Sequence, residues 1–264
     1  MKKAFLVLSI VCITGFAFAG CRKKTAEPQA VAPTPKPRKV DKDVNKEPLE
    51  NRPFVRLSPR QDGKAIDFTI VEVKKQAADL EYEIEYSAGE LIQGAFGTVD
   101  SLSSLPLKKE ILLGSCSSGG KCTYNTNVSG GNLSLRFGNP DYNLKSEWSY
   151  KEKAMKEKVF SSRDAKFTLD VSKAKSTADY IIVHAAPGYP GKIEKTIVAG
   201  PYIIAPAEQI KGNVTVTVRL PLDQDSGTIL AWDGTAWKEW QTKTTDRVST
   251  ATGPMAEVFV VVKK

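Results

Sequence analysis

Leu80-Glu81-Tyr82-Glu83-Ile84-Glu85-Tyr86 alternates apolar and acidic side chains without interruption. Successive side chains of a β-strand point to opposite faces, so this stretch predicts a strand with one buried and one solvent-exposed face. An alternation of apolar with polar side chains recurs in four further runs, at residues 66–70, 133–137, 167–171 and 214–220. Short alternating strands separated by turn residues are typical of antiparallel sandwiches and barrels. The sequence therefore predicts an all-β fold.

Two further runs, residues 180–183 and 258–262, are almost continuously apolar, as expected of strands buried on both faces. Sandwich modules hold about 100 residues each. We therefore expect two tandem antiparallel β-sandwich modules, at residues 54–160 and 161–264. One fused sandwich over the same residues is the alternative.

The second predicted module contains the hairpin motif Trp232-Asp233-Gly234-x-x-Trp237, followed by the apolar run at 258–262. This order resembles the immunoglobulin-like sandwich modules of bacterial surface proteins, over about 50 residues. The resemblance implies an immunoglobulin-like fold for the modules. It implies no activity, because sandwiches host unrelated functions.

Residues 1–20 have the pattern of a signal peptide, with a basic start and a short apolar run. The segment Phe18-Ala19-Gly20-Cys21 that ends it resembles the lipobox of bacterial lipoproteins, with phenylalanine where that family usually has leucine. The resemblance implies cleavage between Gly20 and Cys21, and a lipid (diacylglycerol and palmitate) on Cys21. The alternative is an ordinary secretory signal cut after Ala19 or Gly20.

The implied location is the bacterial cell envelope, outside the cytoplasm, with the membrane as a partner through the lipid anchor. In lipoproteins an aspartate after the cysteine often favours the inner membrane. This chain has Arg22 there, so we expect the outer membrane, if the cell has one. Which membrane holds the protein stays open.

Residues 21–53 are rich in proline and charge and poor in large apolar side chains. Such a composition buries too little surface to offset chain entropy, so a disordered tether is predicted. The net charge of the whole chain is +8, and most of it lies in the leader and tether. The part from residue 54 onward is nearly neutral, so nucleic acid is not an expected partner.

The chain has four cysteines. Cys12 lies in the leader and Cys21 is the predicted lipidation site, which leaves the pair Cys116 and Cys122. Exported compartments permit disulfides, so we predict a disulfide that closes a hairpin loop, stabilising by about 2–3 kcal/mol in the loop-entropy model. A metal or redox pair is the alternative, although the pair lacks C-x-x-C spacing.

Catalytic motifs are scarce. His184 is the only histidine, and a lone histidine beside a strand is more often packed or solvated than catalytic. No Gly-x-Ser-x-Gly or His-Glu-x-x-His motif occurs. Glu81, Glu83 and Glu85 share one strand face, which is typical of a solvated face. We therefore predict a protein that is not an enzyme and has no catalytic residue, cofactor or metal.

Aromatic residues provide the binding hypothesis. Trp232, Trp237 and Trp240 lie in one predicted hairpin, and Trp237 and Trp240 point to opposite faces if the strand is regular. An exposed indole can stack on a sugar ring or on a partner protein. The resulting prediction is a non-catalytic envelope protein that binds a protein or glycan partner. The alternatives are a structural or assembly component of the envelope and a cell-wall or glycan hydrolase using paired carboxylates. The oligomeric state stays open.

Overall fold

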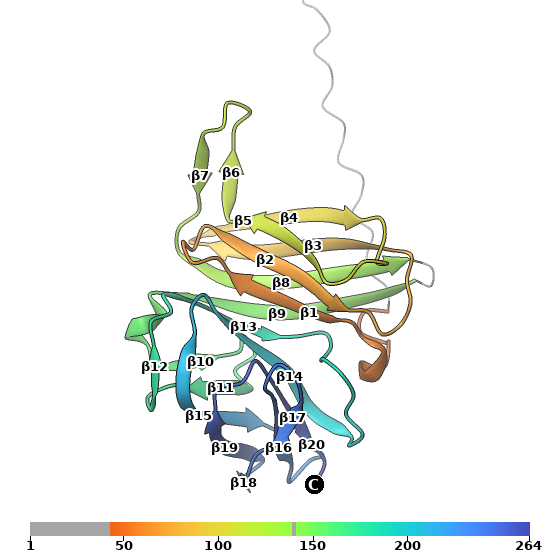
Figure 1. Cartoon of the computed structure of the whole chain (residues 1–264), viewed down its shortest axis with the longest axis vertical. Helices are drawn as coiled ribbons and strands as arrows, with labels where there is room; N and C mark the ends of the chain where they lie inside the picture. The colour runs from red at the N-terminus through yellow and green to blue at the C-terminus, as the bar shows by residue number, and fades with distance from the viewer. Residues whose placement is uncertain (1–42, 139–140) are drawn as a thin grey trace, which may run out of the picture. The chain divides into compact units, whose positions relative to one another are not determined.

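The computed structural model describes residues 43–138 and 141–264 (Figure 1). Its longest sheet is antiparallel and has nine strands in the order β17-β16-β20-β14-β13-β9-β8-β3-β4. In that order the bounds are Trp237–Glu239, Thr228–Trp232, Val258–Val262, Ile197–Pro206, Tyr180–Ala185, Tyr142–Glu152, Val128–Gly138, Asp79–Ala88 and Leu91–Val99.

Three smaller sheets complete the described fold. A three-stranded sheet has the order β1 (Phe54–Pro59), β2 (Ala65–Glu72) and β5 (Leu107–Leu112). A six-stranded sheet consists of β10 (Val159–Ser161), β11 (Phe167–Asp170), β15 (Ile210–Arg219), β19 (Val248–Pro254) and β18 (Thr242–Thr245), with β12 (Ala174–Ser176) also paired to β15. A separate hairpin pairs β6 (Gly114–Cys116) with β7 (Cys122–Tyr124).

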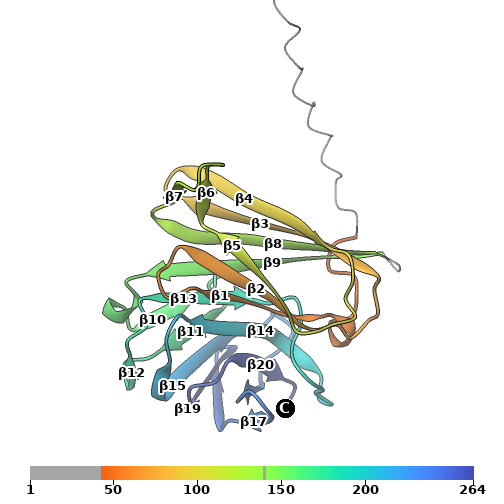
Figure 2. The same cartoon turned by 45° about the horizontal axis from the view of Figure 1, so that its top comes forward.

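Two hydrophobic cores lie on opposite faces of the long sheet. Figure 2 shows the β1–β2–β5 sheet crossing the long sheet near β8 and β9, while β10, β11 and β15 lie against the other half. Strand β13 shows the arrangement most clearly. Ile182 packs in the first core, and its neighbours Ile181 and Val183 pack in the second. The alternation of side chains along one strand therefore supplies both cores.

The all-β prediction is confirmed, because the described residues form antiparallel sheets and contain no α-helix. The finer prediction of two tandem immunoglobulin-like modules is not confirmed. The long sheet runs without a break from one core to the other, through the antiparallel pairing of β9 with β13. The second core also takes Ala154 and Phe160, which precede the predicted boundary at residue 161.

The described part begins at Asp43, although the sequence predicts a tether as far as residue 53. Asn45 explains the difference. Its backbone N–H donates to the carbonyl of Asn143 (2.9 Å), and its side-chain amide exchanges two hydrogen bonds of 2.9 Å with the backbone of Lys145. These bonds hold the incoming chain against β9. The predicted signal peptide, the cleavage site at Gly20 and the lipidation site at Cys21 lie outside the described residues.

Helical structure in residues 43–138 and 141–264 is limited to two 3-10 turns, Leu49–Asn51 and Ala154–Lys156. No helix in this part of the chain is long and apolar enough to span a bilayer. The charged run from Lys151 to Arg163 contains the second of these turns between the end of β9 and β10.

Candidate functional site

The last strand of the long sheet, β4, is the most exposed apolar element of the described fold. Among the described strands it pairs on one side only, with β3. The exposed fractions of Leu91, Ile92 and Phe96 are 64%, 78% and 86%. Proteins usually protect such an edge with charges, proline or a covering loop, because its free backbone groups can pair with another strand. The β4 sequence LIQGAFGTV contains no charge and no proline.

The face of β4 that carries Ile92, Gly94 and Phe96 is called its outer face. On the same side of the long sheet, the neighbouring strands β3, β8 and β9 carry a regular array of mostly polar side chains. Directly opposite pairs place Glu85 beside Gly94 and Glu83 beside Phe96. Reading across β4, β3, β8 and β9, the array has four rows, namely Ile92-Ser87-Gly130-Ser149, Gly94-Glu85-Asn132-Glu147, Phe96-Glu83-Ser134-Lys145 and Thr98-Glu81-Arg136-Asn143. Three of these rows are uncharged or contain one acid and one base. The row of Gly94 alone contains two carboxylates and no basic residue.

Two glycines of β4 differ in what surrounds them. Gly97 lies beneath the Tyr82 side chain, and a methyl group there would collide with the phenol ring. Gly94 has a backbone that any residue adopts, and the nearest atom to an added methyl would be the Ile84 carbonyl oxygen at 3.4 Å. Gly97 is therefore required by packing in the first core, whereas Gly94 leaves a gap on the exposed face between Ile92 and Phe96.

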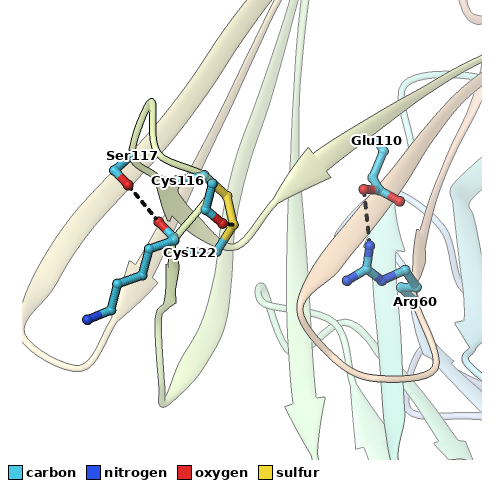
Figure 3. The surroundings of a disulfide bond; sticks show 7 residues. Arg60, Glu110, Cys116, Ser117 and Cys122 are labelled. Atoms are coloured by element: carbon cyan, nitrogen blue, oxygen red, sulfur yellow. Dashed lines mark hydrogen bonds and ion pairs between the residues drawn. A yellow bond between two sulfur atoms is a disulfide. The ribbon is translucent and has the colours of Figure 1, made fainter.

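A disulfide-bonded hairpin stands beside the start of β4. The bond between Cys116 and Cys122 confirms the predicted pairing, and Figure 3 shows it at the base of the exposed loop. Within the loop the Ser117 N–H donates to the Lys121 carbonyl at 2.9 Å. The β6–β7 hairpin projects away from the sheets (Figure 1), so the bond stabilises a local protrusion rather than either core.

The turn between β3 and β4 contacts the chain that leaves this hairpin. The Gly89 N–H donates to the Asn127 carbonyl at 3.1 Å, and Asn127 directly precedes β8. Nearby, Figure 3 shows the Arg60–Glu110 ion pair (3.0 Å), which links the end of β1 to β5. The base of the hairpin is thus connected to the same end of the sheet as Leu91 and Ile92.

His184 belongs to the interior and not to a reactive surface. Its side chain is fully buried, and its Nε2 atom lies 2.9 Å from the Ser146 hydroxyl on β9. Burial lowers the pKa of His184 to about 3, because the charged imidazolium loses its hydration there. The ring is therefore neutral at physiological pH. Of the two settings expected for this histidine, packed or solvated, the structure shows the packed one.

The three tryptophans of the binding hypothesis divide between two sides of the sheet. Trp232 and Trp237 contact each other, with ring centroids 5.5 Å apart. Trp240 is buried in the second core against Phe259, at 5.5 Å. The prediction that Trp237 and Trp240 face opposite ways is confirmed.

The Trp232–Trp237 pair also has a structural role. The Trp237 indole N–H donates to the Pro190 carbonyl at 3.0 Å, and the Tyr189 ring lies at its edge, 6.3 Å away. The pair covers the apolar outer face of β16 and β20, where Leu230 and Val258 are buried. Both indoles are only partly exposed. A ligand role for Trp232 and Trp237 stays a prediction, and the buried Trp240 contributes no part of this surface.

A shallow cleft lies between β1 and the end of β14, where the Arg56–Glu257 ion pair measures 2.8 Å. Asp233 also lines this cleft, but its carboxylate caps its own turn by accepting backbone hydrogen bonds from Thr235 and Ala236. Those bonds lower the pKa of Asp233 to about 2.

In the described part of the chain, no three His, Cys, Asp or Glu side chains gather as a metal site.

No protein-family model, no curated protein and no solved structure matches this chain. Function is therefore inferred from the residues themselves.

The sequence-based prediction missed β4, although a signal exists. Glu90 and Asp100 enclose nine uncharged residues, and among these Ile92 and Phe96 share one strand face. The two glycines in this run weaken the strand pattern, and only the sheet order shows that the strand is an edge.

Proposed function

We propose that this chain is a non-catalytic, lipid-anchored protein of the bacterial cell envelope that binds a partner protein by strand addition at β4. The observation that carries the proposal is the exposed, uncharged edge strand with Ile92 and Phe96 at 78% and 86% exposure. The anchor is supported by the lipobox resemblance around Cys21. The long sheet, with one core packed on each of its faces, serves as the rigid support of this edge.

Strand addition suits the chemistry of β4. A partner strand satisfies the backbone groups on the free side of the edge, and side chains on alternate positions provide specificity. Burying an Ile or Phe side chain contributes about 1.5–3 kcal/mol each. The β6–β7 hairpin lies at one end of this edge and is held by its disulfide. It thus provides a preorganised second contact at a low entropic cost.

The test is site-specific photo-crosslinking in the native host, with a photoreactive phenylalanine analogue placed in the full chain at Ile92 or Phe96. Leu222 is the matched control, because it is 84% exposed but lies in a loop outside the sheets. We expect one discrete covalent adduct from both β4 positions and none from Leu222. Adducts that are the same at all three positions, or absent from β4, contradict the proposal. An adduct with the mass of two chains identifies the partner as a second copy.

The anchor has its own test. Replacing Cys21 with alanine is expected to move the protein from the membrane pellet to the soluble exported fraction, since the lipid-bearing thiol is lost. The measurement is membrane fractionation with labelled palmitate, and Cys12→Ala is the control that leaves the predicted anchor intact. Retention of Cys21→Ala in the pellet with undiminished palmitate label contradicts the lipid anchor.

A further inference from the structure

We infer that the partner of β4 is β4 of a second copy of this chain, paired antiparallel so that Ala95 lies opposite Ala95 and Phe96 lies opposite Gly94. This inference rests on the proposed function and names the partner strand. It follows from the gap at Gly94, from the register that fills this gap in both copies, and from the absence of charge on β4.

Gly94 is a glycine that the chain's own fold does not require. Its backbone is one that any residue adopts, and the nearest atom to an added methyl is the Ile84 carbonyl oxygen at 3.4 Å. Glycine weakens the interior of a strand, and it often marks a place where another group approaches closely. Because Ile92 and Phe96 stand on either side of Gly94 on the outer face, the approaching group enters the gap between them.

One antiparallel register fills this gap in both copies at once. In a two-fold symmetric pair, each contact between two positions occurs twice. With Ala95 on the two-fold axis, Phe96 lies opposite Gly94 of the second copy, and its ring stands between the Ile92 and Phe96 side chains of that copy. An aromatic side chain across from a strand glycine is a stabilising pair. A pair centred on Gly94 would instead place glycine against glycine and leave the gap empty.

The same register also accounts for Leu91, the third exposed apolar side chain of β4. Leu91 comes opposite Val99 of the second copy, which is buried in the first core. The leucine therefore extends that core across the interface. All nine residues of β4 are then paired on both sides, so the backbone groups of the edge are satisfied along its full length.

Charge permits this symmetric pairing. Residues near a two-fold axis meet their own copies, so a charged side chain there would face itself, and the β4 sequence LIQGAFGTV contains none. Glu90 and Asp100 lie opposite each other just beyond the strand ends, where both are exposed and solvent and salt screen their repulsion. Residues 21–42 of the same chain are a poor occupant, because their prolines cannot donate hydrogen bonds to the edge.

The area of this interface predicts a reversible dimer. The two Phe96 rings alone bury roughly 300–400 Å². With the Leu91 and Ile92 side chains and the backbone of both strands, the buried surface comes to about 1,200 Å², the lower end for specific interfaces. We therefore expect a dissociation constant on the order of micromolar, because a small interface leaves little surplus over the entropy lost on association.

The first experiment reads the register by cysteine crosslinking of the full chain in host membranes, under mild oxidation. Ala95→Cys places two thiols opposite each other at the axis, within the distance that a disulfide spans. Gln93→Cys is the matched control on the same face of β4, because in this register its two copies are offset by about 13 Å along the strands. The unsubstituted chain measures any background from its own cysteines.

We expect a covalent dimer from Ala95→Cys and none above background from Gln93→Cys. Equal yields from the two variants, or a dimer from Gln93→Cys alone, overturn the proposed register. No covalent dimer from either variant overturns the second copy as partner.

The second experiment measures the dimer by sedimentation equilibrium of the full chain, purified from its host in detergent. Phe96→Asp removes both rings and should weaken the dimer at least about a hundredfold. Gly94→Leu fills the gap and should weaken it similarly, with Gly94→Ala between this variant and wild type. Leu222→Asp is the control for an exposed apolar residue outside the sheets and should change the constant less than about twofold. Thermal unfolding checks that each variant folds.

The outcomes separate this inference from the proposed function. A monomeric chain whose β4 photo-adducts contain a different protein overturns the second copy as partner and leaves strand addition standing. A dimer that Phe96→Asp and Gly94→Leu do not weaken also overturns the inference, because the copies then meet elsewhere. A monomeric chain without any β4 adduct contradicts the proposed function itself.

Discussion

Replacing Trp148 with alanine is expected to lower the free energy of unfolding by about 3–5 kcal/mol. Trp148 lies on β9 with no exposed surface and belongs to the first core. Its removal leaves a cavity beneath the strand that joins the two halves of the long sheet. Urea unfolding of wild type and variant, followed by far-ultraviolet circular dichroism, measures the difference.

Trp148→Phe is the matched control. The indole Nε1 atom is buried and, within the described residues, has no hydrogen-bond partner, so phenylalanine removes an unsatisfied donor together with some bulk. We expect a smaller loss of about 1–2 kcal/mol. Equal losses for alanine and phenylalanine would contradict this account. A loss below about 1 kcal/mol for alanine would show that Trp148 does not support the core.

Acid is expected to destabilise the protein through His184. Its pKa is about 3 in the fold because of burial, against about 6.5 in an unfolded chain. Above pH 6.5 both states are neutral and His184 adds no pH dependence. As the pH falls below 6.5, only the unfolded state binds the proton. The free energy of unfolding therefore falls by up to about 1.4 kcal/mol per pH unit, or about 3 kcal/mol by pH 4.

His184→Gln isolates this effect, because glutamine keeps a group that can hydrogen-bond Ser146 and does not titrate. Carboxylates with lowered pKa values, such as Asp62 and Asp233, also reduce stability in acid, but they do so in wild type and variant alike. The measurement is urea unfolding of both proteins between pH 7 and pH 4. We expect the difference between the two proteins to shrink steadily below pH 6.5. A difference independent of pH would show that His184 is accessible to protons in the fold.

The strand content was predictable where one face of a strand is buried and the other is not. In β3 the alternation of Tyr82 and Ile84 with glutamates matches an alternation of buried with partly or fully exposed positions in the structure. The opposed directions of Trp237 and Trp240 followed from the same period. These patterns are local, so neighbouring residues in the sequence are enough to show them.

The same patterns could not predict that one long sheet contributes to both cores. The run Ile181-Ile182-Val183 indicates a strand buried on both faces, but it does not say that each face belongs to a different core. That information lies in the pairing of β13 with β9, which is set by packing between distant residues. The edge position of β4 depends on strand order in the same way. The start of the folded part was missed because Asn45 is held by β9, about 100 residues away in the sequence.

The attachment of Asn45 has a mechanical consequence. A force applied through the chain that precedes it arrives first at Asn143 and Lys145, at the start of β9. Strand β9 is bonded on one side to β8 and on the other to β13, so the load divides between the two cores. A protein held from its N-terminal side and pulled through a partner at β4 would thus carry tension across β8 and β3, whose buried side chains belong to the first core.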